Sequence, residues 1–306
     1  MTFKSKIVER VVSQQLHQYL ADNDLLPRYQ SAYRRDHSTA TAMLCVLSDV
    51  LTAANAQQVT LLGLLDLSAA FDCVDYQLLL QRLRRDCRFI ETVLAWTTSF
   101  VTGKTQQVLY KNYLSAVQPV QYGVPQGSVL GRILFVLYTA EIGRIIAQHG
   151  LKFHQYADDC QVYIATSVSA VHSAIDQLSW CLHDVDIWMS ASRLRLNASK
   201  SQVLWLGSRH NIDRLTVHEV PVLLSTVGVF CSARDLCFVI DSWLLIADHV
   251  VSVCRSAYYH LWQIRPTLQS LSCDAAKTLV QAFIPSRLDY CNSVLYGIID
   301  NLLRGL

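Results

Sequence analysis

The sequence predicts an α+β fold that ends in a helical C-terminal lobe. Three observations support this class. Apolar residues recur at helical spacing through the first fifty residues, strand-like runs alternate with helical patterns from about residue 59 to 245, and helical periodicity returns from about Asp248 onward. A length of 306 residues suits about two domains or lobes, and a core of that size needs no disulfide or metal to fold.

The composition excludes several classes of protein. Apolar residues make up 52% of the chain and charged residues 16%, which argues against disorder. The net charge of +2 gives little global attraction to nucleic acid, so any such binding has to rest on local basic patches. No apolar run approaches the roughly 20 residues of a membrane-spanning helix. The ten cysteines form no CxxC pair, which favours free, mostly buried thiols over a structural zinc site.

Periodicity predicts each element of the first 125 residues in turn. Lys4, Glu9 and Arg10 belong to the charged face of a first amphipathic helix. The run Val59–Leu65 is continuously apolar and bounded by polar residues, which is typical of a strand buried on both faces. Further helices are expected over about 39–54, 75–88 and 90–101, and a hairpin around Lys111-Asn112.

The second half mixes helices with short strands. Residues 129–147 are almost wholly apolar and predict one long buried helix. A stripe from Val171 to Met189 recurs at helical spacing and predicts an amphipathic helix. Strands are expected over 152–156 and 160–165, joined by a tight Ala-Asp-Asp turn, and near 202–206 and 236–240.

Three aspartates stand where acids are rarely found. Asp66 ends the apolar run of the first strand, and Asp158-Asp159 form the tip of an apolar hairpin. Unpaired carboxylates there would be costly through desolvation and mutual repulsion, whereas Mg²⁺ would compensate both. Two such ions about 4 Å apart can hold the attacking and leaving oxygens of a phosphoryl transfer. Spacing alone leaves a second interpretation open, in which Asp66 caps a turn and the acidic pair is an ordinary hairpin turn.

Four motifs in fixed order favour the metal site. They are LLDLSAAFDCVD (64–75), GVPQGSVLG (123–131), YADD (156–159) and LNASKS (196–201). This set resembles the reverse transcriptase domain of non-LTR, LINE-type retrotransposons close to the chicken-repeat and jockey groups. Three further segments resemble the family's fingers, primer grip and thumb, so the likeness covers nearly the whole chain. They are QSAYRRDHSTATA (30–42), FVIDSWL (238–244) and SRLDYCNSVLYG (286–297).

The resemblance implies a right-hand polymerase palm and a division of the chain. Partial fingers would occupy residues 1–58, the palm with inserted fingers helices 59–245, and a helical thumb-like segment 246–306. It implies an RNA-directed DNA polymerase that transfers a nucleotide from a dNTP to a DNA primer on an RNA template. Two Mg²⁺ ions would assist, with Mn²⁺ as an alternative. The implied location is intracellular, and nuclear by analogy, with no membrane; the oligomeric state is left open.

The resemblance implies a role for each residue that occupies a functional position of the family's motifs. Asp66, Asp158 and Asp159 would bind the metals, and Lys200 would donate a proton to pyrophosphate, unless it is simply a solvated lysine. The other matches concern substrate: Phe71 under the incoming sugar (or a core phenylalanine), Gln126 and Gly127 beside nucleotide and template, and Arg34 at template or triphosphate. Asp72 and Asp75 are expected to be structural. The cations expected to grip nucleic acid, unless they are a solvated face, are Arg82, Arg84, Arg85, Arg88, Lys104, Arg193 and Arg195.

Several positions depart from the family pattern. In the fingers segment Ala32, Tyr33, Arg35 and Asp36 replace Gly, Phe, Pro and Gly, which should alter the backbone of that loop. Arg132 replaces a proline after the second motif. In the primer grip LGV is replaced by LCF (236–238), adding bulk where a glycine would let the primer approach.

The chain also starts inside the family's first finger helix, so an N-terminally truncated element copy without its upstream fingers hairpin and endonuclease is expected. Two alternatives to an active polymerase follow. One is an inactive remnant that folds and binds RNA, and the other is a two-metal nuclease, for which no typical motif is visible.

Overall fold

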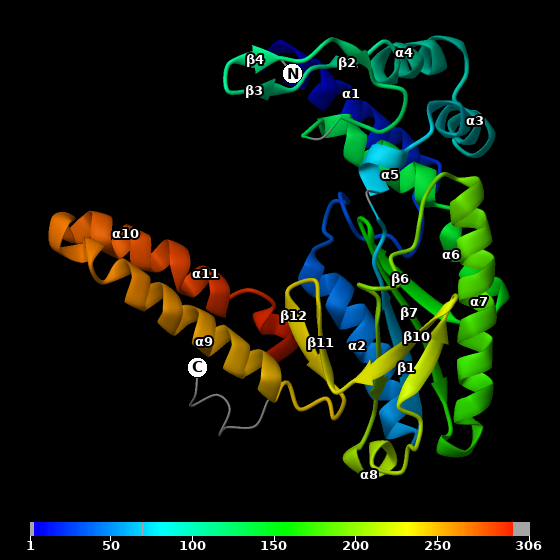
Figure 1. Cartoon of the computed structure of the whole chain (residues 1–306), viewed down its shortest axis with the longest axis vertical. Coiled ribbons are helices and arrows are strands. Elements are labelled where there is room, and N and C mark those ends of the chain that lie inside the picture. Colours follow the sequence, from blue (N-terminus) through cyan, green and yellow to red (C-terminus); the bar gives the residue numbers. More distant parts are fainter. Residues whose placement is uncertain (1–2, 69, 126, 296–306) are drawn as a thin grey trace.

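A six-stranded mixed sheet forms the centre of the molecule in the computed structural model, which describes residues 3–68, 70–125 and 127–295 (Figure 1). The strand order is β6-β7-β1-β8-β10-β9, and every pairing is antiparallel except that between β8 and β10. The strands are β1 (Val59–Leu65), β6 (Lys152–Tyr156), β7 (Asp159–Thr166), β8 (Gln202–Leu206), β9 (Glu219–Val222) and β10 (Ser225–Phe230).

Strand β1 is buried along its whole length, as its sequence predicts, because both faces of the sheet are covered. Leu61 and Leu65 belong to one core, to which the helices α6 (Ile142–Gln148) and α7 (Val171–Ala191) contribute. Leu62 and Leu64 belong to a second core, to which α2 (Thr39–Asn55) contributes. The predicted stripe of α7 faces the first core and is buried throughout, which confirms that interpretation.

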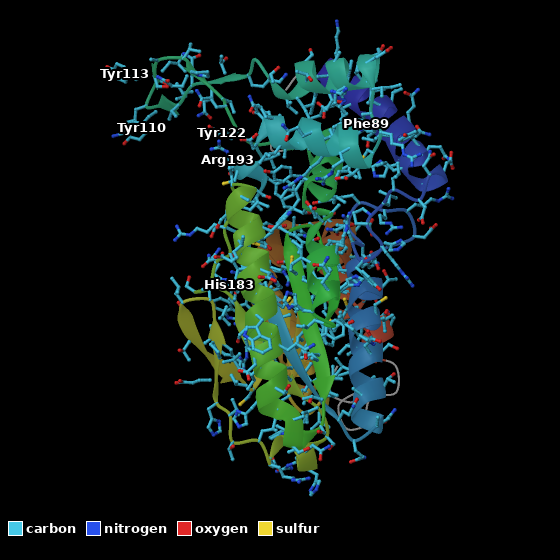
Figure 2. The ribbon with its side chains drawn as sticks, turned by 90° about the vertical axis from the view of Figure 1, so that its right-hand side faces the viewer. Phe89, Tyr110, Tyr113, Tyr122, His183 and Arg193 are labelled. Atoms are coloured by element: carbon cyan, nitrogen blue, oxygen red, sulfur yellow. The ribbon has the colours of Figure 1, made fainter. Side chains whose placement is uncertain are left out.

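A second layer of helices lies beyond one end of the sheet, at the top of Figure 1. It contains α1 (Phe3–Asp22), α3 (Tyr76–Asp86), α4 (Glu91–Val101) and α5 (Val129–Thr139). The predicted hairpin projects from this layer as two short ladders, β2 (Thr105–Gln106) with β5 (Gln118–Pro119) and β3 (Leu109–Tyr110) with β4 (Tyr113–Leu114). Lys111 and Asn112 form its turn with φ of 44° and 68°, and Tyr110 and Tyr113 lie at its far end (Figure 2).

Glu9 joins two helices of this layer. Its expected place on the charged face of α1 was wrong, because the side chain does not face solvent. Its side chain is buried, and Oε2 accepts hydrogen bonds from the Ser128 hydroxyl (2.9 Å) and the Val129 amide (2.8 Å). Ser128 in turn caps α5 by accepting from the Gly131 amide. A carboxylate at a helix N-terminus satisfies free amide groups and interacts favourably with the helix dipole. Glu9 therefore fixes α1 against the start of α5.

Glu9→Gln is expected to lower the free energy of unfolding by about 1 kcal/mol, because a neutral amide oxygen accepts weaker hydrogen bonds and loses the dipole interaction. The measurement is urea denaturation, with a lower midpoint at an unchanged slope. The matched control is Glu91→Gln, an exposed glutamate in the first turn of α4, which should stay within about 0.5 kcal/mol of the original protein. Equal effects of the two substitutions would contradict this role of Glu9.

The C-terminal part extends away from the sheet as a helical arm, at the left of Figure 1. A hairpin of β11 (Ser232–Asp235) and β12 (Phe238–Asp241) leads into it. Its helices are α9 (Ala247–Ile264), α10 (Cys273–Phe283) and the short α11 (Pro285–Leu288). The hairpin turn holds Leu236 and Cys237 at φ of 45° and 64°, a region that favours glycine, so the backbone of this turn is strained.

Tyr290 supports that turn from the far end of the chain. Its hydroxyl lies 2.6 Å from the Leu236 carbonyl oxygen and 2.8 Å from Thr39 Oγ1, in hydrogen-bond contact with both. Cys291 and Val294 follow it into the second core. The last described segment thus closes over the start of α2 and the turn between β11 and β12.

The structure corrects several expectations. The helix expected over 129–147 is two helices, because α5 ends at Thr139 and α6 begins at Ile142. Strands β9 to β11 were not expected. Cys45, Cys231, Cys237 and Cys273 are exposed, so the prediction that the thiols are mostly buried is wrong. Among the described helices, none has the length and apolar character needed to cross a membrane.

Candidate active site

Strand pairing brings Asp66 and Asp159 to the same end of the sheet. Strands β1 and β7 run antiparallel, and the last pair in their register is Leu65 with Cys160. Asp66 follows Leu65 and Asp159 precedes Cys160, so the two aspartates are the next positions on neighbouring strands. The chain passes from this end of β1 to α3, so this end of the sheet faces the helical layer of α1, α3, α4 and α5 (Figure 1).

Asp158 belongs to the two-residue turn between β6 and β7. Tyr156 pairs with Asp159, so Ala157 and Asp158 form the turn, and Ala157 has a φ of 58°. Burial, chiefly, and the charge of Asp66 raise the pKa of Asp158. Desolvation of its carboxylate and the charges of Asp158 and Asp66 raise the pKa of Asp159 to about 6. Each acid of the pair therefore lies within electrostatic range of Asp66.

The segment that carries Lys200 runs alongside Asp66. The Asn197 amide donates to the Asp66 carbonyl oxygen (2.8 Å), and the Ser68 amide donates to the Arg195 carbonyl oxygen (2.9 Å). Lys200 Nζ lies 3.7 Å from Asp66 Oδ2, an ion pair beyond hydrogen-bond distance. Within the described residues, buried Asp66 Oδ2 accepts no hydrogen bond. The first, third and fourth motifs thus meet around one carboxylate that has unused acceptor capacity.

The cluster of Asp66, Asp158 and Asp159 has the chemistry to bind a hard divalent cation. All of its donors are oxygens, which Mg²⁺ and Mn²⁺ prefer, and a cation would relieve the repulsion that raises the pKa of Asp158 and Asp159. In the described part of the chain, no group of three or more histidine, cysteine, aspartate or glutamate side chains is already gathered for a metal ion. Binding would therefore draw the carboxylates closer together.

The second motif is held against the first through backbone hydrogen bonds. The Gly123 amide donates to the Val74 carbonyl oxygen (2.8 Å), and the Val124 amide donates to that of Phe71 (2.9 Å). Phe71 itself is half-buried, with its ring centroid 4.3 Å from that of Phe135. Gly127 has a φ of 74° and no protein atom where a Cβ would stand, so its backbone borders open space. Gln126 lies outside the described residues.

Arg34 folds back onto its own loop. Its guanidinium donates to the carbonyl oxygens of Pro27 (3.1 Å) and Gln30 (3.2 Å). In this arrangement the arginine organises the loop that precedes α2. Contact with template or triphosphate stays a prediction. Tyr33 and Arg132, two departures from the family pattern, lie together, with the guanidinium carbon 5.4 Å from the ring centroid.

Two of the cations expected to grip nucleic acid are structural instead. Half-buried Arg82 donates to the Tyr138 carbonyl oxygen and the Ser192 hydroxyl, both at 2.6 Å. Arg193 Nε lies 2.6 Å from Asp75 Oδ2, and its guanidinium lies over the Tyr122 ring at 5.0 Å (Figure 2). Asp75 also caps α3, which confirms its predicted structural role. Four of the expected cations are exposed and form no ion pair with any described residue, namely Arg84, Arg88, Lys104 and Arg195.

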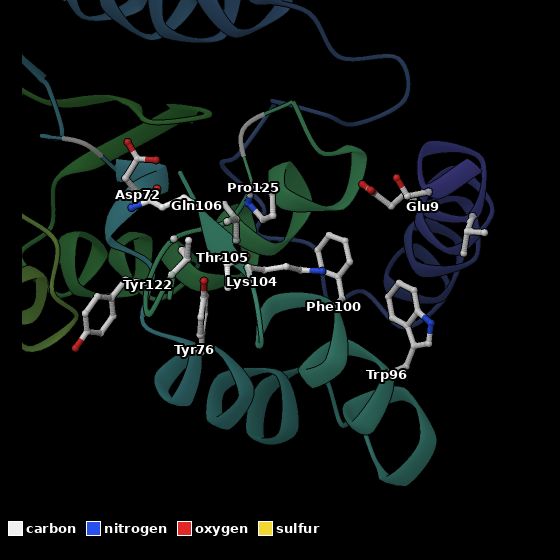
Figure 3. Close-up of a pocket in the computed structure, with 15 residues that line it drawn as sticks. Glu9, Asp72, Tyr76, Trp96, Phe100, Lys104, Thr105, Gln106, Tyr122 and Pro125 are labelled. Atoms are coloured by element: carbon white, nitrogen blue, oxygen red, sulfur yellow. The ribbon is translucent and has the colours of Figure 1, made fainter. Parts of the chain in front are cut away.

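A cavity of about 680 Å³ borders the second motif (Figure 3). Its walls come from α1, α4, the base of the hairpin and the stretch 120–125. Lys104 reaches into it beside Phe100, with Tyr122 and Pro125 on the opposite wall (Figure 3). None of Asp66, Asp158 and Asp159 lines it.

Sequence reasoning missed a buried polar pair next to the acidic turn. Gln161, two positions along β7 from Asp159 and on the same face, donates through Nε2 to Asp235 Oδ1 at 3.0 Å. Burial, above all, raises the pKa of Asp235 to about 6, with a further contribution from the charge of Asp159. The pair ties the β11–β12 hairpin to the acidic strand. The available signal was a glutamine inside an otherwise apolar run.

Comparison with known proteins identifies a family and several relatives. Residues 1–223 match the family of reverse transcriptases (RNA-dependent DNA polymerases). The RNA-directed DNA polymerase from the mobile element jockey of Drosophila melanogaster is 27% identical over 209 residues, which cover 67% of this chain and 22% of that protein. Its counterpart from Drosophila funebris is 25% identical over 305 residues, covering 96% and 32%. The chain thus spans about a third or less of these relatives.

Solved structures of telomerases resemble the fold of this chain. The apo telomerase of Candida tropicalis has a TM-score of 0.52 at 12% identity, over 78% of this chain and 44% of that one. The telomerase of Candida albicans, in complex with a TWJ fragment of telomeric RNA, also has a TM-score of 0.52, at 11% identity over 99% and 54%. At such identity the likeness concerns the fold alone.

The family match covers most of the chain, and the motifs meet at one end of the central sheet. The resemblance to non-LTR retrotransposons is confirmed by the two jockey relatives. The chain therefore belongs to the reverse transcriptase (RNA-dependent DNA polymerase) family and has the α+β, right-hand palm fold of these polymerases.

Proposed function

We propose that this chain is the catalytic part of an RNA-directed DNA polymerase that extends a DNA primer on an RNA template. The observation that carries the proposal is the meeting of Asp66, Asp158, Asp159 and Lys200, from three separate motifs, at one end of the palm sheet. In the reaction the primer 3′-hydroxyl loses its proton to water, and its oxygen forms a bond to the α-phosphorus of a dNTP. The bond to pyrophosphate breaks, and pyrophosphate leaves.

Asp66, Asp158 and Asp159 are the residues that would hold the divalent metal, Mg²⁺ or Mn²⁺, in two sites. Such ions stabilise the negative charge that develops on phosphate oxygens. Lys200 carries an ammonium 3.7 Å from Asp66, within reach of a leaving group bound there, and would give its proton to pyrophosphate. Catalysis would otherwise depend on positioning, without a covalent intermediate.

The substrate contacts are assigned by motif and local structure. Gln126 and Gly127 would border the nucleotide and template, and the open space beside Gly127 leaves room for a close approach of nucleic acid. Phe71 would lie under the sugar of the dNTP. Arg34 would touch the template or triphosphate only by leaving one of its two carbonyl partners. An RNA template is supported by the names of the jockey relatives, and a nuclear location would follow from copying into genomic DNA.

The decisive experiment is dTTP incorporation on a poly(rA) template with an oligo(dT) primer, in Mg²⁺ or Mn²⁺ and with EDTA as the blank. Incorporation that needs the ion would support the proposal. The matched control for replacing Asp158 and Asp159 by asparagine is Asp24→Asn. Asp24 is an exposed loop acid at φ 53°, a conformation that asparagine accepts. No incorporation by folded protein in either ion would refute the proposal, and strand cleavage instead of synthesis would identify a nuclease.

A further inference from the structure

A buried glutamine of the fingers segment holds the acidic turn by its backbone. Gln30 is 2% exposed. Its Oε1 accepts a hydrogen bond from the Ala157 amide (3.0 Å), and its Nε2 donates to the Ala157 carbonyl oxygen (3.1 Å). The same Oε1 accepts from the Ala32 amide at 2.9 Å. One side chain thus binds both peptide groups of the residue that immediately precedes Asp158.

The residue that Gln30 binds needs such support. Ala157 has a φ of 58°, in the left-handed region that residues with a Cβ disfavour, and it is itself 8% exposed. Its neighbour Asp158 repels Asp66, which acts to push the turn outward. Two hydrogen bonds from a buried amide oppose both tendencies, because either change of the turn would leave Gln30 Nε2 without its acceptor and remove one of the two donors to Oε1.

The loop that carries Gln30 is itself fixed beside the acidic hairpin. The Gln155 amide donates to the Tyr29 carbonyl oxygen (2.8 Å), and the Ser31 amide donates to the Gln155 carbonyl oxygen (2.9 Å). Residues 29–31 therefore lie along β6, joined to it by an isolated parallel β-bridge between Gln30 and Gln155. Arg34, bonded to the Gln30 carbonyl oxygen, braces the loop from the other side. Gln30 therefore approaches the turn from a rigid support.

We infer that Gln30 is a positioning residue, which sets the direction of the Asp158 and Asp159 carboxylates by holding Ala157 in its left-handed conformation. The inference rests on the proposed polymerase function, because it assigns a task to those carboxylates. It also makes the fingers loop part of the catalytic apparatus, although Gln30 touches no substrate. The bonds that carry it are those from Gln30 to Ala157.

Amide hydrogen exchange tests the contact without any need for activity. Gln30→Leu removes the three hydrogen bonds, and Gln177→Leu is the matched control, because that half-buried glutamine binds the His149 carbonyl oxygen near the opposite end of the β6–β7 hairpin. Gln30→Leu is expected to speed exchange at least tenfold in residues 155–160 and to leave β1 and α7 unchanged. Unchanged exchange in the turn, or an equal rise in β1 and α7, would overturn the inference.

Activity supplies the second measurement and separates a positioning role from a structural one. Gln30→Leu is expected to lower kcat for dTTP incorporation about tenfold with little change in KM, while Gln177→Leu leaves both near their original values. Adding Ala157→Gly to Gln30→Leu should restore at least a third of the lost kcat, because glycine adopts the left-handed conformation without help. A loss that glycine does not rescue would overturn the inference. An original protein that incorporates no dTTP would refute the proposed function, and the exchange experiment would still decide whether Gln30 holds the turn.

Discussion

Replacing Asp158 and Asp159 together by asparagine is expected to lower dTTP incorporation at least about a thousandfold and, in EDTA, to raise the melting temperature. The loss of incorporation follows because the asparagines keep the shape of the turn but not its charge. The gain in stability follows because two carboxylates that repel each other and Asp66 become neutral. One substitution pair therefore moves activity and stability in opposite directions.

The pH dependence of that gain has a definite sign. The pKa of Asp159 is about 6 in the folded protein, above the roughly 3.9 of an unfolded aspartate. Between these two pKa values, Asp159 is protonated in the folded state and ionised in the unfolded state. The folded original protein therefore loses stability as the pH rises and Asp159 becomes charged. The melting-temperature difference should be small near pH 4, grow to about pH 6, and then level off. Thermal melts from pH 4 to 8 measure it.

Divalent metal provides the control for this prediction. Mg²⁺ should raise the melting temperature of the original protein and narrow or reverse the difference, because only the carboxylates bind the ion. A double variant that melts at a lower temperature than the original protein in EDTA at pH 7 would show that the acidic pair does not destabilise the fold. Full incorporation by the variant would remove these residues from the catalytic site.

Gly123→Ala is expected to lower the free energy of unfolding by about 3 kcal/mol or more and to abolish incorporation. A Cβ on residue 123 would stand 2.8 Å from the Asp72 carbonyl oxygen and 3.0 Å from its Cα, with φ at 90°. Both contacts are to backbone, so no rotation of a side chain relieves them. The second motif would have to separate from the first, breaking the hydrogen bonds to Phe71 and Val74.

Gly103→Ala is the matched control. Its φ of 69° imposes the same kind of backbone penalty, but no protein atom lies within 4 Å of the added Cβ. The control should cost about 1 kcal/mol, and the excess loss in Gly123→Ala then measures the contact with Asp72. Guanidinium denaturation monitored by circular dichroism gives both values. Equal losses in the two variants would contradict the close approach.

Elements with a strong local pattern were predicted well from the sequence. The run Val59–Leu65 and the stripe of α7 follow from burial, which imposes its own spacing on apolar residues. The break between α5 and α6 carries no glycine or proline, and tertiary contacts surround it. There Glu141 accepts a hydrogen bond from the Trp188 indole at 3.0 Å. Such partners lie far apart in the chain, so local periodicity cannot predict their contacts.

The site shows the same division. The sequence predicted both strands but not their pairing, and the antiparallel register in the structure is what sets Asp66 beside Asp159. The motifs also indicated that the segment of Gln30 and Arg34 matters, but not that both residues act on backbone atoms. Arg82 was expected among cations that contact nucleic acid, yet it is enclosed by protein. A sequence motif identifies the type of residue at each position. The hydrogen-bond partners of that residue depend on the folded structure.

The contact of Tyr290 with the Leu236 carbonyl oxygen sets an order of events during synthesis. A ribosome releases the chain from its N-terminus, so all six strands of the sheet emerge before Tyr290 does. Until then the turn at Leu236 and Cys237 has no tie from this side, although both residues are in a conformation that glycine would adopt more readily. The nascent protein can therefore build its sheet before Tyr290 is available to secure the turn between β11 and β12.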